Sequence, residues 1–453
     1  MKALIIGSGG REHAMVRKLA RSDRVEAVFA APGNGGTAGE AKCQNLPVPG
    51  DDPSSDAGGE AVLQFARRER IDLTVVGPEG PLAAGLTDRF RAAGLAVVGP
   101  DKRAAGLEAS KGLAKSFMEK YGVRTARSKT FTDHGRALRY AADYFHIPDT
   151  LEKPPVIAPP PLVVKADGLA AGKGVVIAEN YNEAAEALDS FMEKGILGAA
   201  GKTVVLEEFL PGREVSVLAA VSVKPGAGGG TILPFVSARD HKRRFDGGRG
   251  PNTGGMGAVA PAPDFSAAAA EDFRRFILQP TLRGMEAEGM DYRGFIFFGL
   301  MVREERCSLL EYNVRLGDPE AQAVLPLLDS DFGELCAAIL DGTLADFPLK
   351  WKAGAVCAPV LVAEGYPGPC RTGDPITVDQ EKLAKTGAEL FVAGARRGNV
   401  PGEDGDGLYT AGGRVLAVSA LGAGPEEART RAYAAIEALN FAGMAWRGDI
   451  GGE

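Results

Sequence analysis

Residues 308–320 read SLLEYNVRLGDPE. Alternate side chains of a strand share one face, so Glu311, Asn313 and Arg315 would lie together, while Leu310 and the apolar residues that follow would face the core. A carboxylate and an amide oxygen are suitable ligands for a Mg²⁺ ion that also binds water and nucleotide phosphates. Arg315 would then meet an anion beside the metal. The alternative is a half-exposed strand with a solvated polar face, and the rest of the chain must decide between the two.

The composition limits the class of protein. The chain has 453 residues, of which 45% are hydrophobic and 25% charged, and this is typical of a globular protein of about three domains. A net charge of -7 argues against a protein that binds nucleic acids or membrane surfaces, because binding to either needs a basic protein surface. No segment has the pattern of a signal peptide or a membrane span.

The cysteines and histidines carry no metal-site pattern. The five cysteines are widely spread and never form C-x-x-C, so we expect neither disulfides nor zinc, and a cytoplasmic location. The four histidines also lack metal-ligand spacing, so we expect structural roles for them.

The N-terminal region predicts a phosphate-binding loop. An apolar strand at 3–6 is followed by GSGGREH at 7–13 and then by a helical pattern. Backbone N–H groups at Gly9 and Gly10 would suit an anion, and Arg11 would add positive charge. Further strands that end at glycines predict a doubly wound parallel sheet over residues 1–105, with its ligand crevice at the carboxyl ends.

A dinucleotide-binding oxidoreductase is the obvious alternative for this region. Such a site needs an acidic residue at the end of the second strand, but residues 29–32 read FAAP. The loop also lacks the full G-x-G-x-x-G spacing. Both observations disfavour this alternative.

A second glycine-rich loop lies in the middle of the chain. Residues 162–177 read LVVKADGLAAGKGVVI, which predicts a strand, a flexible loop and a second strand. The glycines would let the backbone approach phosphate oxygens and the lysines would neutralise them, although a mobile hairpin tip has the same pattern. These residues are Gly168, Gly172, Gly174, Lys165 and Lys173. Before this loop, a helix is predicted from Glu108 to about Lys120, and the proline-rich stretch at 146–161 predicts an exposed excursion.

The following segments add polar groups. The strand at 203–210 breaks at Pro211-Gly212, so its unpaired backbone groups could bind an adenine edge, with Glu214 available for ribose hydroxyls. Residues 240–244 and 251–257 are polar or glycine-rich and badly suited to regular structure, so we expect loops that close over a substrate. Arg414 lies at the start of a strand predicted near the C-terminus. There it could bind a substrate phosphate or be an ordinary surface arginine.

These segments together resemble a known family. GSGGREH (7–13), APGNGGTA (31–38), VVGPEGPL (75–82), KADGLAAGKGV (165–175), DHKR (240–243), GPNTGGMG (250–257), EYNVRLGDPEAQ (311–322) and GYPG (365–368) occur in the order found in phosphoribosylamine–glycine ligases, also called glycinamide ribonucleotide synthetases, of the ATP-grasp superfamily. The resemblance implies an α/β fold with three parts. They are an N-terminal doubly wound domain (1–105), an ATP-grasp domain (106–340) with a lid subdomain at about 127–205, and a small C-terminal α+β domain (341–453).

The resemblance also implies an activity. Glycine would be joined to 5-phosphoribosylamine through glycyl phosphate, with ATP cleaved to ADP and phosphate, in de novo purine synthesis. No protein nucleophile is needed, because positioning and charge neutralisation do most of the work in phosphoryl transfer. A sister ATP-grasp enzyme acting on another acid and a catalytically silent nucleotide-binding module are the alternatives. We expect a monomer, with at most transient contact with the enzyme that supplies phosphoribosylamine.

The family pattern assigns roles residue by residue. Mg²⁺ or Mn²⁺ would bind Glu311 and Asn313, and the strand before them, at 299–302, offers no further acidic ligand. ATP phosphates would bind Lys111, Lys165 and the 168–174 loop, while adenine would face Glu207, Glu208 and Leu210, and ribose would face Glu214. Glycine and the acyl phosphate would be oriented by Arg315 and Asp318, which with Lys165 form the predicted catalytic set, helped by Asn252, Thr253 and Gly254. Phosphoribosylamine would be held by Gly9, Gly10, Arg11, Glu79 and Arg414.

Overall fold

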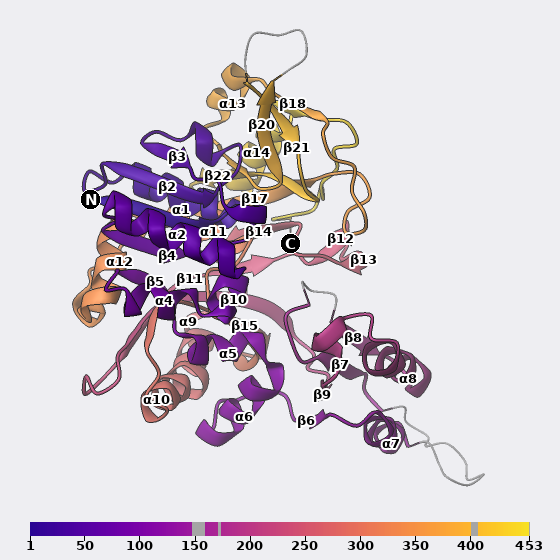
Figure 1. Cartoon of the computed structure of the whole chain (residues 1–453). Coiled ribbons are helices and arrows are strands. Elements are labelled where there is room, and N and C mark those ends of the chain that lie inside the picture. Colours follow the sequence, from indigo (N-terminus) through magenta and orange to yellow (C-terminus); the bar gives the residue numbers. More distant parts are fainter. Residues whose placement is uncertain (147–158, 171–173, 400–405, 453) are drawn as a thin grey trace.

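The computed structural model describes residues 1–146, 159–170, 174–399 and 406–452 (Figure 1). The fold is mixed α/β, as predicted, and most strands belong to one 13-stranded sheet that runs through the molecule. Most of the predicted proline-rich excursion, and the predicted ligands Gly172 and Lys173, lie outside the described residues.

The N-terminal part of this sheet is parallel and doubly wound. Its strand order is β5-β4-β1-β2-β3, and the order reverses between β1 and β4. A ligand crevice is expected at the carboxyl ends of these two strands, where the 7–10 and 77–80 loops lie. The elements are β1 (Lys2–Gly7), α1 (Gly10–Ala20), β2 (Ala27–Pro32), β3 (Cys43–Asn45), α2 (Asp56–Glu69), β4 (Leu73–Val76), α3 (Glu79–Ala84), α4 (Leu86–Ala92) and β5 (Val97–Pro100).

The sheet continues into an antiparallel half. Strand β5 pairs with β15, and the order then runs β15-β10-β11-β14, with β16 beside β15. The elements here are α5 (Lys102–Ala109), α6 (Lys111–Tyr121), β10 (Arg213–Val223), β11 (Thr231–Asp240), β14 (Gly257–Ala260), α9 (Ala267–Phe273), α10 (Gln279–Ala287), β15 (Tyr292–Arg303), β16 (Arg306–Asn313), α11 (Glu320–Leu327) and α12 (Phe332–Asp341).

Two local predictions in this half were wrong. The single helix predicted from Glu108 is two helices, because Ser110 is extended and its hydroxyl accepts a hydrogen bond from Leu113 N–H at 3.0 Å, which caps a new helix. The polar segments predicted as loops at 240–244 and 251–257 instead contribute strands β12 (Arg243–Phe245) and β13 (Arg249–Asn252), which pair as a hairpin.

A separate four-stranded sheet projects from the body at the lower right of Figure 1, and we call it the lid region after the predicted lid subdomain. Its strand order is β6-β9-β7-β8, and it has its own hydrophobic core. The chain enters from the body before Ser128 and returns after Glu208. The elements are β6 (Ser128–Phe131), α7 (His134–Tyr144), β7 (Leu162–Ala166), β8 (Val175–Ala178), α8 (Tyr181–Leu188) and β9 (Val204–Glu208).

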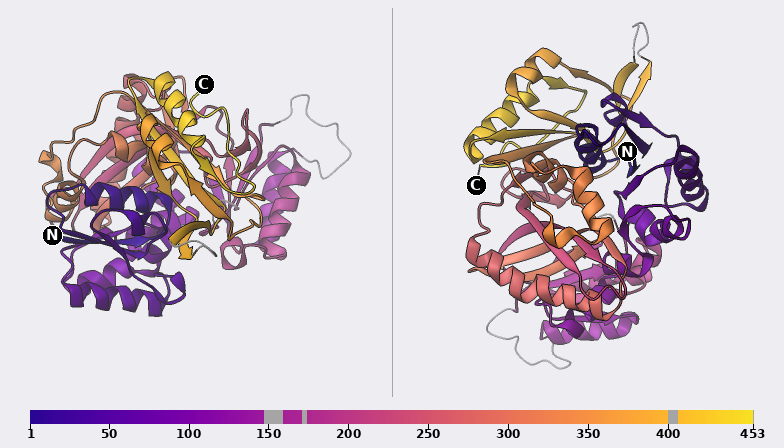
Figure 2. Two further views of the ribbon diagram at one scale, coloured as in Figure 1. Left: turned by 90° about the horizontal axis from the view of Figure 1, so that it is seen from above. Right: turned by 90° about the vertical axis from the view of Figure 1, so that its left-hand side faces the viewer.

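The C-terminal region extends the large sheet and adds a small one. Strands β17, β22 and β19 complete the long sheet, while β20-β21-β18-β23 form a second sheet. Figure 2 shows this region beside the N-terminal domain, and α1 contacts β19 directly. The elements are β17 (Ala355–Val362), β18 (Pro375–Val378), α13 (Gln380–Thr386), β19 (Glu389–Val392), β20 (Ala395–Asn399), β21 (Asp406–Thr410), β22 (Arg414–Gly422), α14 (Pro425–Ile436) and β23 (Leu439–Asn440).

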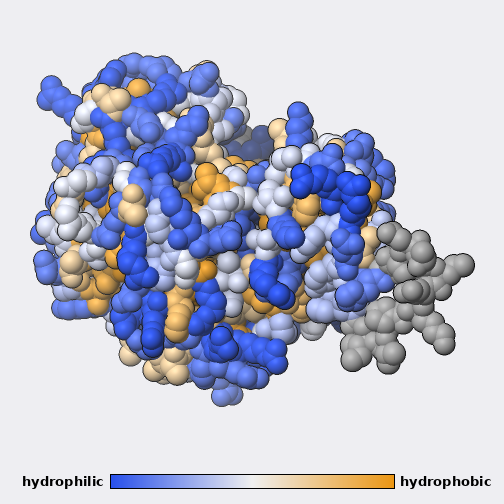
Figure 3. Space-filling view, turned by 90° about the horizontal axis from the view of Figure 1, so that it is seen from below, coloured by the Kyte–Doolittle hydropathy of each residue, from blue (hydrophilic) through white to orange (hydrophobic). Residues whose placement is uncertain are grey.

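The surface is mainly polar on the face drawn in Figure 3, where apolar residues gather only in small separate patches. Across the part of the chain that the structure describes, no helix has the length and apolar character needed to cross a bilayer. All five cysteines are free thiols.

Candidate active site

One cleft of about 1400 Å³ lies where the N-terminal crevice, the antiparallel half, the lid region and the C-terminal region meet. It gathers most of the predicted site residues. Those on its wall are Gly9, Arg11, Glu79, Lys111, Lys165, Gly168, Gly174, Glu207, Glu208, Leu210, Glu214, Asn252, Thr253, Gly254, Glu311, Asn313, Arg315, Asp318 and Arg414. Gly10 is not on the wall; it packs against Gln322 so closely that a Cβ would lie 2.4 Å from the amide nitrogen.

The predicted metal strand is β16, and one of its side chains departs from the predicted alternation. A bulge shifts the register so that Gly299 pairs with Glu311 and Leu300 pairs with Leu309. Leu309 is therefore buried in the core, whereas Leu310 lies on the cleft wall, contrary to its predicted orientation. After the bulge the alternation holds, because Tyr312 is buried and both Glu311 and Asn313 reach the cleft.

Glu311 lies in a strongly positive environment. Burial opposes its ionisation, but Lys242, Lys165 and Lys111 outweigh burial and lower the pKa of Glu311. An ionised carboxylate and the Asn313 amide oxygen are hard ligands that fit a divalent cation. Within the described ranges no group of three or more His, Cys, Asp or Glu could hold a metal, so such an ion would need its other ligands from water and phosphates.

Arg315 is held between two carboxylates. Its guanidinium lies 3.1 Å from Glu79 Oε2 and 2.9 Å from Glu108 Oε1, and Glu108 Oε2 accepts a hydrogen bond from Val314 N–H at 2.7 Å. Burial opposes protonation of Arg315, but Glu108 and Glu79 raise its pKa further above the usual value. Glu79, predicted to bind substrate, is therefore already an arginine partner. Glu108 was missed, because a glutamate in a helical pattern gives no signal of a buried partner.

Lys165 forms part of a buried ionic triad. Its ammonium lies 2.9 Å from Glu207 Oε2, and Lys115 Nζ lies 3.2 Å from the same oxygen. Burial, with the nearby Lys165, lowers the pKa of Lys115 to about 8. The other oxygen of Glu207, Oε1, is buried and has no hydrogen-bond partner among the described residues. Lys115 was also missed, although its spacing of four from Lys111 places it on the same helix face.

Glu208 is held differently from its neighbour. Arg127, at the entrance to the lid region, lies 2.7 Å from Glu208 Oε2, so this carboxylate points toward the two connections between the lid region and the body, before Ser128 and after Glu208, which we call the hinge. The lid is also tied to α6. Lys111 Nζ donates to Gly168 O at 3.2 Å, and Asp167 Oδ1 accepts from Gly112 N–H at 3.0 Å.

An acidic pocket lies beside the metal strand. Ser216 Oγ donates to Glu320 Oε1 at 2.9 Å, and burial together with the Glu320 charge raises the pKa of Asp240 well above its usual range. Asp240 Oδ1 is buried without a hydrogen-bond partner in the described part of the chain. Nearby, Lys242 Nζ lies 2.6 Å from Glu214 Oε2, the carboxylate predicted to bind ribose. Two acids in a cleft with an unsatisfied oxygen are suited to a cationic group.

The N-terminal loop is built around a buried carboxylate. Glu12 is 1% exposed; its Oε2 accepts from Gly9 N–H at 2.6 Å and its Oε1 from Arg11 Nε at 2.6 Å. A Cβ at Gly7 or Gly77 would lie within 2.6 Å of atoms of Glu12. These glycines are therefore needed for the packing of Glu12. The N–H of Gly9, which was predicted to suit an anion, is therefore already used inside the protein.

Arg414 joins the C-terminal region to this cleft. Its Nη1 donates to Asp318 O at 2.7 Å and to Gly254 O at 2.5 Å, and its Nη2 lies 3.3 Å from Asp318 Oδ2. Burial opposes ionisation of Asp318, but Arg414 and Arg11 lower its pKa. Arg414 therefore lies on the cleft wall and not on the plain surface.

Comparison with known proteins finds family models and relatives that together cover the whole chain. Family models described as phosphoribosylglycinamide synthetase N domain, ATP-grasp (A) domain and C domain match residues 1–108, 109–321 and 355–453. The chain is 45% identical to the phosphoribosylamine–glycine ligase of Clostridium acetobutylicum, over 100% of this chain and 99% of that protein. It is 44% identical to the trifunctional purine biosynthetic protein adenosine-3 of Gallus gallus, over 99% of this chain and 42% of that protein.

Solved structures agree on the fold. The crystal structure of the phosphoribosylamine–glycine ligase of Thermotoga maritima has a TM-score of 0.78 and 33% identity, covering 99% of this chain and 100% of that one. The biotin carboxylase domain of a 2-oxoglutarate carboxylase from Hydrogenobacter thermophilus, in complex with MgADP, has a TM-score of 0.69 at 14% identity, over 98% of this chain and 91% of that one. The second likeness is one of fold alone.

Proposed function

The chain belongs to the phosphoribosylglycinamide synthetase family, and from that premise we propose how its own residues carry out the ligation. The enzyme is an ATP-dependent ligase of purine biosynthesis that joins glycine to 5-phosphoribosylamine. The observation that carries the residue-level proposal is the single cleft that brings Glu311 and Asn313 together with Lys111, Lys165 and Arg315.

The chemistry requires that a carboxylate be activated. A glycine carboxylate oxygen attacks the γ-phosphorus of ATP, the bond to the β-phosphate oxygen breaks, and ADP leaves with glycyl phosphate formed. The amine of phosphoribosylamine then attacks the carbonyl carbon and phosphate leaves. Both steps gather negative charge on phosphoryl oxygens, so cations held rigidly nearby lower the barrier. Lys111, Lys165 and Arg315 supply those cations.

Glu311 and Asn313 would hold the divalent cation, which we propose to be Mg²⁺ or Mn²⁺. When bound, this ion would neutralise phosphate charge and fix the orientation of the triphosphate. The fit rests on the donor set, since both side chains offer hard oxygens on the cleft wall and Glu311 has a lowered pKa.

Adenine would meet the hinge of the lid region. The unsatisfied Glu207 Oε1 could accept a hydrogen bond from an exocyclic amino group, with Leu210 giving apolar contact. Glu208 would act at the hinge through Arg127. Glu214 would accept from ribose hydroxyls once Lys242 turns toward the phosphates.

The ammonium group of glycine needs a negative pocket, and we assign it to Asp240 and Glu320. The unsatisfied Asp240 Oδ1 and the strongly raised pKa of this carboxyl are both relieved by a cation. The carboxylate of glycine would then lie toward Arg315, with the 252–254 segment, which Arg414 contacts at Gly254, closing the site.

Phosphoribosylamine would enter the N-terminal crevice. The N–H groups that begin α1, together with Arg11 and Arg414, would hold its phosphate, while Glu79 would reach a ribose hydroxyl or the amine. We also propose that the enzyme acts as a monomer and that it works in the cytoplasm. Contact with the enzyme that supplies phosphoribosylamine would be transient.

The direct test is ADP release by the purified protein with ATP and Mg²⁺, adding glycine and freshly generated phosphoribosylamine singly and together. Turnover only with both substrates supports the ligase, and product formation should follow ADP release one for one. Asp240→Asn tests the glycine assignment, since it should raise the KM for glycine about tenfold or more while the KM for ATP stays constant. Equal changes in both constants would reject that assignment.

A further inference from the structure

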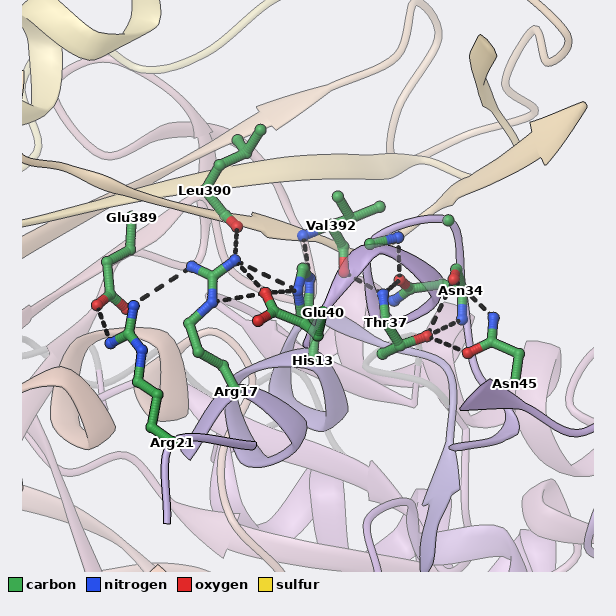
Figure 4. Close-up of polar contacts among 12 residues, drawn as sticks. His13, Arg17, Arg21, Asn34, Thr37, Glu40, Asn45, Glu389, Leu390 and Val392 are labelled. Carbon is green, nitrogen blue, oxygen red and sulfur yellow. Dashed lines mark hydrogen bonds and ion pairs between the residues drawn. The ribbon is translucent and has the colours of Figure 1, made fainter. Parts of the chain in front are cut away.

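The APGNGGTA segment at 31–38 has no role in the reaction as described above, yet it is densely hydrogen-bonded. Figure 4 shows a polar cluster in which this segment and α1 face strand β19 of the C-terminal region. Three side chains of the N-terminal domain, His13, Asn34 and Arg17, each contact the backbone of β19.

Asn34 bridges the two domains with one amide. Its Nδ2 donates to Ser8 O at 2.8 Å in the N-terminal loop and to Val392 O at 2.8 Å in β19. Its Oδ1 accepts from Gly36 N–H at 2.8 Å and Thr37 N–H at 3.0 Å, which fixes the side chain. Asn34 is 8% exposed, so its amide cannot satisfy these bonds with water.

His13 completes the contact. Its Nδ1 accepts a hydrogen bond from Val392 N–H at 2.8 Å, so the ring hydrogen must be on Nε2, which donates to Glu40 Oε1 at 2.9 Å. Arg17 also binds Glu40 Oε1 and donates to Leu390 O at 2.9 Å. Both backbone polar groups of Val392 are thus held by the N-terminal domain, on the outer edge of the long sheet.

This contact leads directly to the cleft at both ends. On one side, Ser8 belongs to the loop that begins α1. On the other side, Val392 pairs with Leu416 of β22, and Gly394 N–H donates to Arg414 O at 2.8 Å. The side chain of Arg414 then reaches Asp318 and Gly254.

We infer that Asn34 and His13 are positioning residues that set the distance between the phosphate-binding loop and Arg414, and so the affinity for the ribose phosphate of the substrate. This inference rests on the proposed function, because it assumes that loop and arginine bind the same ribose phosphate. Neither residue touches the substrate. The APGNGGTA segment is therefore an interdomain joint, with Asn34 as the residue that links the two sides.

The sharpest variant is Asn34→Asp. It keeps the shape and the oxygen that accepts from Gly36 and Thr37, but it replaces the donor that faces Ser8 O and Val392 O. The dissociation constant for glycinamide ribonucleotide, the stable product that carries the same ribose phosphate, should rise roughly tenfold, while that for ADP with Mg²⁺ stays constant. Calorimetry gives both values. Amide exchange at 389–394 should quicken in the ligand-free protein.

Two further variants separate positioning from general instability. His13→Asn places an amide oxygen near the position of Nδ1 and should preserve affinity, whereas His13→Ala should weaken it like Asn34→Asp. Arg21→Ala is the matched control, because it removes only an exposed ion pair with Glu389 at the same interface and should leave both constants unchanged.

A double-mutant cycle decides the route. In an Arg414→Ala background the effect of Asn34→Asp should shrink to about threefold or less, since the residue it positions is gone. A full tenfold effect in that background, or equal weakening of ADP and product, overturns the inference. If the wild type binds ADP but not glycinamide ribonucleotide, the proposed function itself fails. Unchanged amide exchange at 389–394 in Asn34→Asp would separately reject the role of Asn34 in linking the two domains.

Discussion

Glu108→Gln removes the charge of a carboxylate that pairs with Arg315, and we expect a large loss of activity. Glu108 lies 2.9 Å from the Arg315 guanidinium and its side chain is 6% exposed. Removing one member of a buried ion pair costs about 3–5 kcal/mol, because the remaining charge stays buried without its partner. Arg315 still pairs with Glu79 in this variant. We therefore expect the transition state to lose about 2–3 kcal/mol of stabilisation by Arg315. That value corresponds to a fall of roughly 30- to 160-fold in kcat/KM.

The design keeps the fold intact. A glutamine at 108 still offers an oxygen to Val314 N–H, so the local backbone should hold. Steady-state ADP release with glycine varied, at saturating ATP, measures kcat/KM. Glu288→Gln is the matched control, because Glu288 also pairs with basic residues, Arg103 and Lys120, but lies outside the cleft. A Glu108→Gln enzyme within about twofold of the control would refute the idea that Glu108 orients Arg315.

Three further predictions use the same assay or simple unfolding. Glu311→Gln should lower turnover by about a hundredfold or more, and wild-type turnover would reject the metal assignment. Lys115→Met leaves Glu207 with Lys165 alone and should raise the KM for ATP about tenfold without changing that for glycine; an unchanged KM for ATP would count against the triad. Burial lowers the pKa of His13 below its usual value near 6.5, so the unfolded chain binds a proton more readily and stability should fall as pH drops below about 6.5. His13→Asn should flatten that part of a urea-midpoint profile, and an identical slope in the variant would contradict this reasoning.

The fold was predictable wherever a local pattern determines it. The strand-loop-helix at 2–20 follows from one apolar run and its glycines, and the parallel order follows from strands that alternate with helices. The break at Ser110 was missed because an N-cap serine inside a continuous helical pattern looks like a surface residue. Pairing of β12 with β13 was missed because polar, glycine-rich strands lack the alternation by which strands are recognised.

The residues that line the cleft were predictable from the sequence, whereas the contacts among them were not. Glu311 and Lys165 were selected from short motifs, and both lie on the cleft wall. Their partners come from distant elements; Glu108 and Arg315 are far apart in the chain, and no pattern within either segment indicates the pair. The bulge at Leu310 is likewise a property of two paired strands, and the sequence of one strand cannot specify it.

The cleft keeps its main cations beside carboxylates, and this arrangement explains how buried charges can be stable there. Lys165 lies against Glu207, Lys242 against Glu214 and Arg414 against Asp318. Isolated charges would be costly to bury, whereas paired ones are held in place before ATP arrives. We propose that a triphosphate with its metal, which brings both signs of charge, exchanges partners with these pairs. Lys242 would turn to phosphate and release Glu214 to the ribose. Glu214, the residue predicted to bind ribose, therefore pairs with Lys242 here because its carboxylate accepts hydrogen bonds, and the same property suits it to ribose hydroxyls.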